Sequence, residues 1–147
     1  MEFRERIEKD EARKALAEQR ETEANRAKDE RLAWSYEGTA RKAVRSWAKR
    51  VGAEITNLQV ELFITYQYPS RQLLRLSWQV DGYEFQGNFY EEKEVLSPKR
   101  STLLHVELWD ADHGGGWYQA ETKHEIARVF NGKAAIDSAN SDYTNKM

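Results

Sequence analysis

The chain has 147 residues, of which 33% are charged, with a mean hydropathy of −0.89 and a formal net charge of −2; this suits one ordinary domain with polar extensions. Because 23 basic residues nearly balance 25 acidic ones, no global field draws the protein to nucleic acid or to an anionic membrane. The lack of cysteine excludes disulfides, thiolate metal sites and cysteine nucleophiles.

The first 33 residues form a charged segment without Gly or Pro. Glu, Arg, Lys and Ala dominate it, and three acids stand four residues before a base, which favours a helix. The large apolar residues Phe3, Ile7 and Leu16 are too few for a coiled-coil seam, so we predict a helical arm that projects and orders against a partner. No apolar run resembles a signal peptide or a membrane span of about 20 residues, and we expect a cytoplasmic protein.

A second helix is predicted at 39–51, from Thr39 as a capping residue to the position before Gly52. Its apolar residues recur at spacings of three and four, which indicates one buried face. The opposite side carries four cations within an arc of about 100°: Arg41, Lys42, Arg45 and Lys49. This stripe suits contact with nucleic-acid phosphates, although exposed helix faces are charged by default.

After this helix the apolar residues alternate, as in strands with one buried face. Four strands follow from the alternation, at about 55–66, 74–80, 83–89 and 102–109. Asp81 and Gly82 are the signature of a tight hairpin, so the second and third strands should be antiparallel neighbours. Short connections then favour a four-stranded antiparallel meander.

The C-terminal part is predicted to contain one more helix, at about 119–131, which ends before Gly132. The remaining residues, 133–147, are small and polar and are expected to be disordered. The sequence therefore predicts an α+β fold in which a domain at 34–132 packs its helices on one face of the sheet. The long charged helix at 1–33 precedes this domain.

Potential metal ligands gather shortly before three consecutive glycines. Two imidazoles and three carboxylates there have the chemistry to hold a divalent cation: His105, Glu107, Asp110, Asp112 and His113. Their spacing matches no ligand signature, and a polar strand face followed by a solvated turn explains them as well. A metal-dependent hydrolase at His105 and Asp112 is thus a minor hypothesis, and we predict no cofactor, no bound metal and no enzymatic activity.

Aromatic residues outside the predicted core indicate a surface that binds a partner. They are Trp34, Tyr36, Phe63, Trp109, Trp117 and Tyr118. The first hypothesis is a non-enzymatic adaptor or inhibitor that docks on a larger protein or nucleoprotein assembly through this surface and the arm. The alternative is a nucleic-acid-binding protein that uses the helix at 39–51. Nothing in the sequence indicates an oligomeric state.

Overall fold

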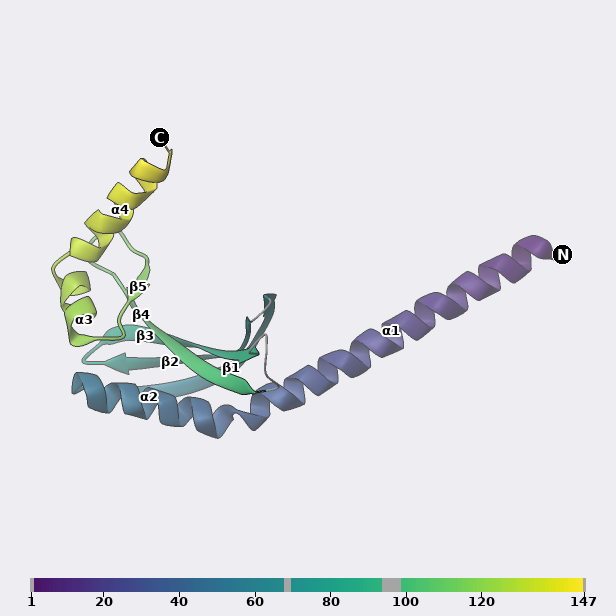
Figure 1. The fold of residues 1–147 in the computed structure, drawn as a ribbon, viewed down its shortest axis with the longest axis horizontal. Coiled ribbons are helices and arrows are strands. Elements are labelled where there is room, and N and C mark those ends of the chain that lie inside the picture. The colour runs from purple at the N-terminus through teal and green to yellow at the C-terminus, as the bar shows by residue number, and fades with distance from the viewer. Residues whose placement is uncertain (1, 68–69, 94–98, 147) are drawn as a thin grey trace.

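A computed structural model describes residues 2–67, 70–93 and 99–146 (Figure 1). It confirms the predicted α+β class. Four helices are present in this part of the chain: α1 (Phe3–Ser35), α2 (Glu37–Val51), α3 (Lys123–Phe130) and α4 (Lys133–Lys146). Five strands lie between α2 and α3: β1 (Thr56–Gln67), β2 (Ser70–Val80), β3 (Tyr83–Lys93), β4 (Arg100–Trp109) and β5 (Trp117–Gln119).

The strands form one antiparallel sheet in the order β1-β2-β3-β4-β5. This is the predicted meander with one strand more than the predicted four. The additional strand, β5, has only three residues, too few for an alternation to be detected in the sequence. The hairpin between β2 and β3 turns at Asp81 (φ 50°) and Gly82 (φ 84°), the two left-handed conformations that its tight turn requires.

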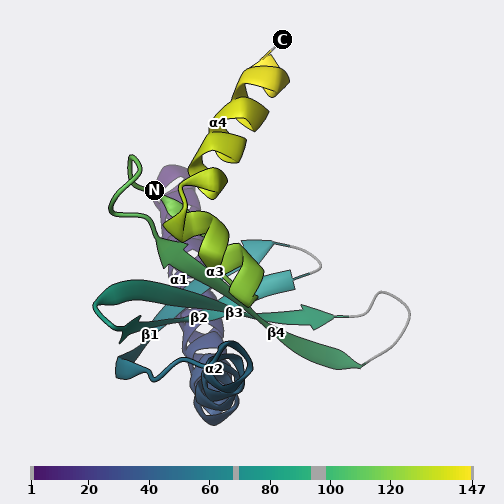
Figure 2. The same cartoon turned by 90° about the vertical axis from the view of Figure 1, so that its left-hand side faces the viewer.

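The apolar core lies between α2 and one face of the sheet. Helix α2 buries Ala40, Val44 and Trp47, as its spacing predicts. The sheet contributes alternate residues of β2, β3 and β4: Leu74, Leu76, Trp78, Phe85, Phe89, Val106 and Leu108. Helix α3 packs beside β5 and adds Val129 to the same core, while α4 extends away from the sheet (Figure 2).

Gly87 in β3 makes room for the side chain of Trp78. A Cβ atom at this position would lie 2.8 Å from Leu104 Cδ1 and 3.0 Å from the Trp78 ring. The indole of Trp78 therefore lies across the backbone of β3, where it contacts the rings of Trp47 and Phe85. Glycine is required here for close approach and not for its backbone conformation.

Helix α1 divides into a projecting part and a packed end. Side chains of residues 3–28 are exposed, whereas Ala33 is fully buried in the core. Tyr36 alone separates α1 from α2, so α2 begins two residues before the predicted capping residue Thr39. In the described ranges no helix, α1 included, has an apolar stretch long enough for a membrane span.

The C-terminal residues differ from the predicted disordered tail, because Lys133–Lys146 form α4. Gly132 (φ 75°) ends α3, and the run Lys133-Ala-Ala that follows has good helix formers. Ala134 also packs against the core, a tertiary contact that the polar composition of the segment does not reveal.

Candidate binding surfaces

The sheet face opposite α2 carries polar side chains at alternate positions. Antiparallel pairing places one residue from each strand in a row across this face: Gln59, Ser77, Gln86, Glu107 and Gln119. We call the surface formed by this row and its neighbours on the same side of the strands the open face. Gln59, Ser77 and Gln119 are exposed, so no helix covers it fully.

A chain of hydrogen bonds fixes the centre of the open face. The Asn88 Oδ1 atom accepts from Gln72 Nε2 at 2.8 Å and from Arg75 Nε at 3.1 Å. The Nδ2 atom of Asn88 donates to Glu107 Oε1 at 2.7 Å, and Gln86 Nε2 donates to the same oxygen at 3.1 Å. A register shift after Gln72 puts this side chain on the open face. The amides are therefore held in place before any partner binds.

Two tryptophans stand at the β5 edge of the open face. Trp109 and Trp117 are paired in the β4–β5 register, with ring centroids 5.4 Å apart and planes inclined by 59°. Their exposed fractions are 37% and 38%. Shallow hollows lie on both sides of Trp117: one reaches Glu61 and Glu84, and the other reaches Glu107 below α3. Trp117 thus stands between two concave polar surfaces.

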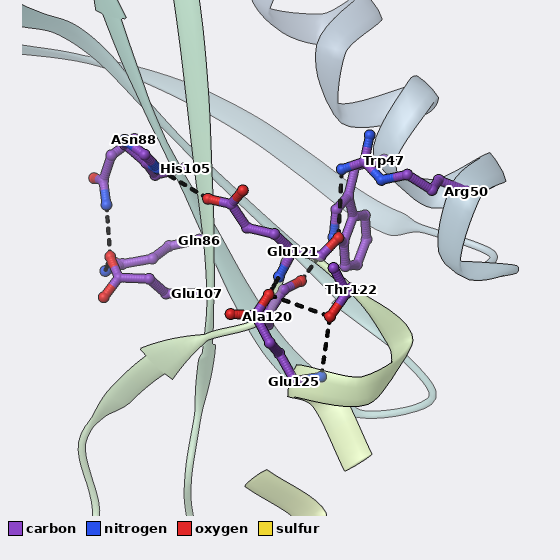
Figure 3. Close-up of polar contacts among 10 residues, drawn as sticks. All are labelled: Trp47, Arg50, Gln86, Asn88, His105, Glu107, Ala120, Glu121, Thr122 and Glu125. Carbon is purple, nitrogen blue, oxygen red and sulfur yellow. Dashed lines mark hydrogen bonds and ion pairs between the residues drawn. The ribbon is translucent and has the colours of Figure 1, made fainter. Parts of the chain in front are cut away.

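The connection between β5 and α3 is held from both sides of the sheet (Figure 3). From the core side, Trp47 Nε1 donates to the carbonyl oxygen of Ala120 at 2.8 Å. From the open face, His105 Nδ1 lies 2.8 Å from Glu121 Oε1. Thr122 then caps α3 by accepting a hydrogen bond from the backbone N–H of Glu125. A strand of three residues is thereby fixed by its neighbours.

The open face has an excess of negative charge. Glu61 and Glu84 are exposed and have neither a hydrogen bond nor an ion pair with any described residue. Arg75 is paired with Glu61 in the β1–β2 register, but its guanidinium donates to Asn88 and lies 3.8 Å above the Phe63 ring. The predicted contact residue Phe63 is therefore covered on one side. A cation would be attracted to this surface and an anion repelled.

The predicted basic stripe on α2 is only partly free. Arg41 donates to Glu37 Oε1 at 3.2 Å and is half-buried. Lys42, Arg45 and Lys49 are exposed, and none has a hydrogen-bond or ion-pair partner within the described ranges. We call these three residues the basic ridge. The ridge lies on the side of α2 away from the sheet, so it and the open face point in opposite directions (Figure 1).

A partly buried ionic cluster joins α1 to the sheet. Tyr36 donates its hydroxyl to Glu91 Oε2 at 2.8 Å, and Arg71 reaches both Glu91 Oε1 (3.2 Å) and Asp29 Oδ1 (3.4 Å). Arg100 adds a contact of 3.6 Å to Glu91, whose side chain is only 5% exposed. The hydrogen bond to Glu91, followed by burial and the carboxylate charge, raises the pKa of Tyr36 above 10.0. Tyr36, predicted as a contact residue, thus ties the helix junction to the sheet.

The potential metal ligands separate into sets with different partners. His105 pairs with Glu121, and Glu107 accepts the amides of the open face. Asp110 Oδ1 instead lies 3.1 Å from His113 Nδ1 and accepts backbone N–H groups of its own turn. Among the described residues no three His, Asp or Glu side chains are grouped so that they could hold a metal ion. This geometry offers no support for a metal-dependent hydrolase.

The structure brings together only two of the six predicted aromatic contact residues, Trp109 and Trp117. Trp34 is 42% exposed but lies at the end of α1, and Tyr118 is half-buried against the core. Sequence reasoning missed the carboxylates Glu61 and Glu84, which line the same hollow as Trp117. Their alternation with apolar residues signals an outward direction, but the hollow that they share with Trp117 depends on the pairing of all five strands.

The fold and these surfaces define an α+β protein with an uncovered sheet face, a basic helix and a projecting helix. No family model, no curated protein and no solved structure matches this chain. The charge, shape and exposure of the surfaces are therefore the basis on which a function is proposed.

Proposed function

We propose that this protein is a non-enzymatic binding module whose open face docks on a cationic segment of a larger protein assembly. The exposed Trp109 and Trp117 pair, between two hollows that reach carboxylates, is the observation that supports this proposal. Tryptophan dominates binding energy at many protein interfaces because it buries a large area with few rotatable bonds. A neighbouring cation gains further attraction from the indole face and from Glu84.

Pre-organisation of the open face adds to this support. Gln72 and Asn88 are buried and hydrogen-bonded, so docking orders few additional side chains. Helix α1 offers a second contact at a distance, since residues 3–28 extend roughly 40 Å at about 1.5 Å per residue. The cluster around Glu91 holds the last turns of α1 against the sheet and sets its direction.

Affinity capture from the source cells tests the proposal. The bait is the full chain, compared with the variant W117A and with W34A, which removes an equally exposed tryptophan outside the open face. A central anchor contributes about 2 kcal/mol or more, so W117A should retain roughly thirtyfold less of a specific partner. W34A should retain it as the unaltered chain does. Equal capture by W117A, with its unfolding midpoint unchanged, would refute the role of the open face.

Nucleic-acid binding through the basic ridge is a second candidate, favoured by three cations of α2 that have no ion-pair partner in the described part of the chain. Three phosphate contacts to duplex DNA predict that affinity falls roughly fortyfold between about 50 and 200 mM salt. Fluorescence anisotropy with a labelled duplex measures this slope. The variant K42Q/R45Q/K49Q should abolish it, and an absence of binding even at low salt would eliminate this candidate.

A further inference from the structure

The two main exposed surfaces of the domain are complementary in charge and lie on opposite sides. The basic ridge is formed by Lys42, Arg45 and Lys49 on α2, and the open face presents Glu61 and Glu84, which have no hydrogen-bond or ion-pair partner among the described residues. Helix α1 leaves the domain at the end away from α3, so it covers neither surface (Figure 1). Each copy thus carries both halves of a possible contact.

The length of the basic ridge is close to the spacing of one pair of carboxylates on the open face, Glu84 and the hydrogen-bonded Glu107. Seven residues separate Lys42 from Lys49, which corresponds to about 10 Å along a helix. On the open face, Glu84 and Glu107 lie on neighbouring strands two positions out of register, about 8 Å apart by the usual strand spacings. Trp117 stands beside both hollows, where a ridge cation would rest on its indole face.

We propose that the basic ridge of one copy docks on the open face of a second copy, so that the protein associates head to tail. This inference rests on the proposed function, since it uses the same open face and names its cationic partner. A ridge can never meet its own open face within one copy, because they point apart. Such a heterologous contact repeats from copy to copy and produces chains or closed rings larger than a dimer.

Two variants that each disable one side test the proposal. The ridge variant is K42Q/R45Q/K49Q, and the face variant is E61Q/E84Q. Glutamine removes the charges without reversing them. With reversed charges, the acidic ridge of one variant would attract the basic face of the other in the mixture and create a new contact. A control, K9Q/R13Q/K14Q, removes three cations from the exposed part of α1 and so changes the net charge as the ridge variant does.

Sedimentation velocity at low salt, over a range of concentrations, is the measurement. The unaltered chain and the control should form species beyond the dimer that dissociate as salt is raised. The ridge variant and the face variant, each measured alone, should self-associate at least tenfold more weakly than the unaltered chain. An equimolar mixture of the two should form dimers and nothing larger, because one intact ridge and one intact face remain.

Three results would overturn head-to-tail docking: a monomeric unaltered chain at high concentration and low salt, oligomers that survive in either variant, or a mixture that stays monomeric. A different result would refute the proposed function: equal capture of a partner by W117A and by the unaltered chain. A chain that is monomeric but captures a partner through Trp117 would therefore refute self-docking and leave the binding module standing.

Discussion

The hydrogen bond between Tyr36 and Glu91 should stabilise the whole domain, because it joins the helix junction to the sheet. The substitution Tyr36→Phe removes one hydroxyl and keeps the ring, whose centroid is 5.9 Å from that of Phe89. The lost bond has a length of 2.8 Å and ends on a carboxylate that is 5% exposed. Hydrogen bonds to charged groups contribute about 1.5–3 kcal/mol. Since Arg71 and Arg100 still contact Glu91, we expect a loss near 1.5 kcal/mol.

Urea unfolding at neutral pH measures this loss, and a double-mutant cycle with Glu91→Ala, which leaves no side-chain acceptor for the hydroxyl, assigns it to the pair. If the two residues interact as the structure shows, the double variant loses less stability than the sum of the single losses. The expected coupling is about 1 kcal/mol. A coupling within experimental error would show that the bond contributes nothing and that the junction is held by packing alone.

The pH dependence provides an independent check with a defined sign. The pKa of Tyr36 is raised in the folded protein, so above about pH 10 the unfolded chain loses this proton first. The stabilisation is complete below pH 10 and is lost as the pH rises through the folded pKa. The difference in unfolding free energy between the unaltered chain and Tyr36→Phe should therefore narrow above pH 10. A difference that stays constant there would refute the reasoning.

Three further outcomes follow from packing. Gly87→Ala places a methyl group 2.8 Å from Leu104 Cδ1, so it should lower the unfolding free energy by about 1–3 kcal/mol; an unchanged urea midpoint would mean that Trp78 moves aside freely. Trp47→Phe leaves the buried carbonyl of Ala120 without its donor, which should cost about 1–3 kcal/mol and accelerate hydrogen exchange in β5; unaltered exchange would contradict the bridging role. Deletion of residues 2–28 should shift the melting temperature by less than about 2 °C. Deletion of residues 2–35 also removes the buried Ala33 and should lower the melting temperature clearly. Equal effects of the two deletions would contradict the division of α1 into a projecting part and a packed end.

Local patterns were sufficient to predict most elements of this fold. The spacing of Val44 and Trp47 indicates the buried side of α2, and Asp81 with Gly82 indicates the hairpin between β2 and β3. These signals work because helix periodicity and turn geometry are set by residues close together in the chain. The sequence patterns did not predict β5 or α4. Pairing with β4 orders β5, and a contact of Ala134 with the core anchors α4.

The candidate surfaces show the same division more sharply. The cations of α2 share one side by helical spacing alone, so the sequence indicates the stripe; it does not show that Arg41 is bound to Glu37. Tyr36 and Trp117 look equivalent in the sequence as aromatic residues outside the periodic core. Only the assembled sheet brings Glu91 within hydrogen-bonding distance of the Tyr36 hydroxyl and leaves Trp117 exposed next to Trp109.

The sequence by itself thus determined the class of fold, the antiparallel order of the main strands and the amphipathic character of α2. The tertiary structure decided which aromatic and charged side chains are free, because that depends on partners brought from distant strands. Pairing of the five strands brings Trp117 to the rim of the hollow that reaches Glu84 on β3 and Glu61 on β1, although more than thirty positions separate Trp117 from either carboxylate in the chain. No local periodicity encodes such a neighbourhood, since it arises from the register of successive strands.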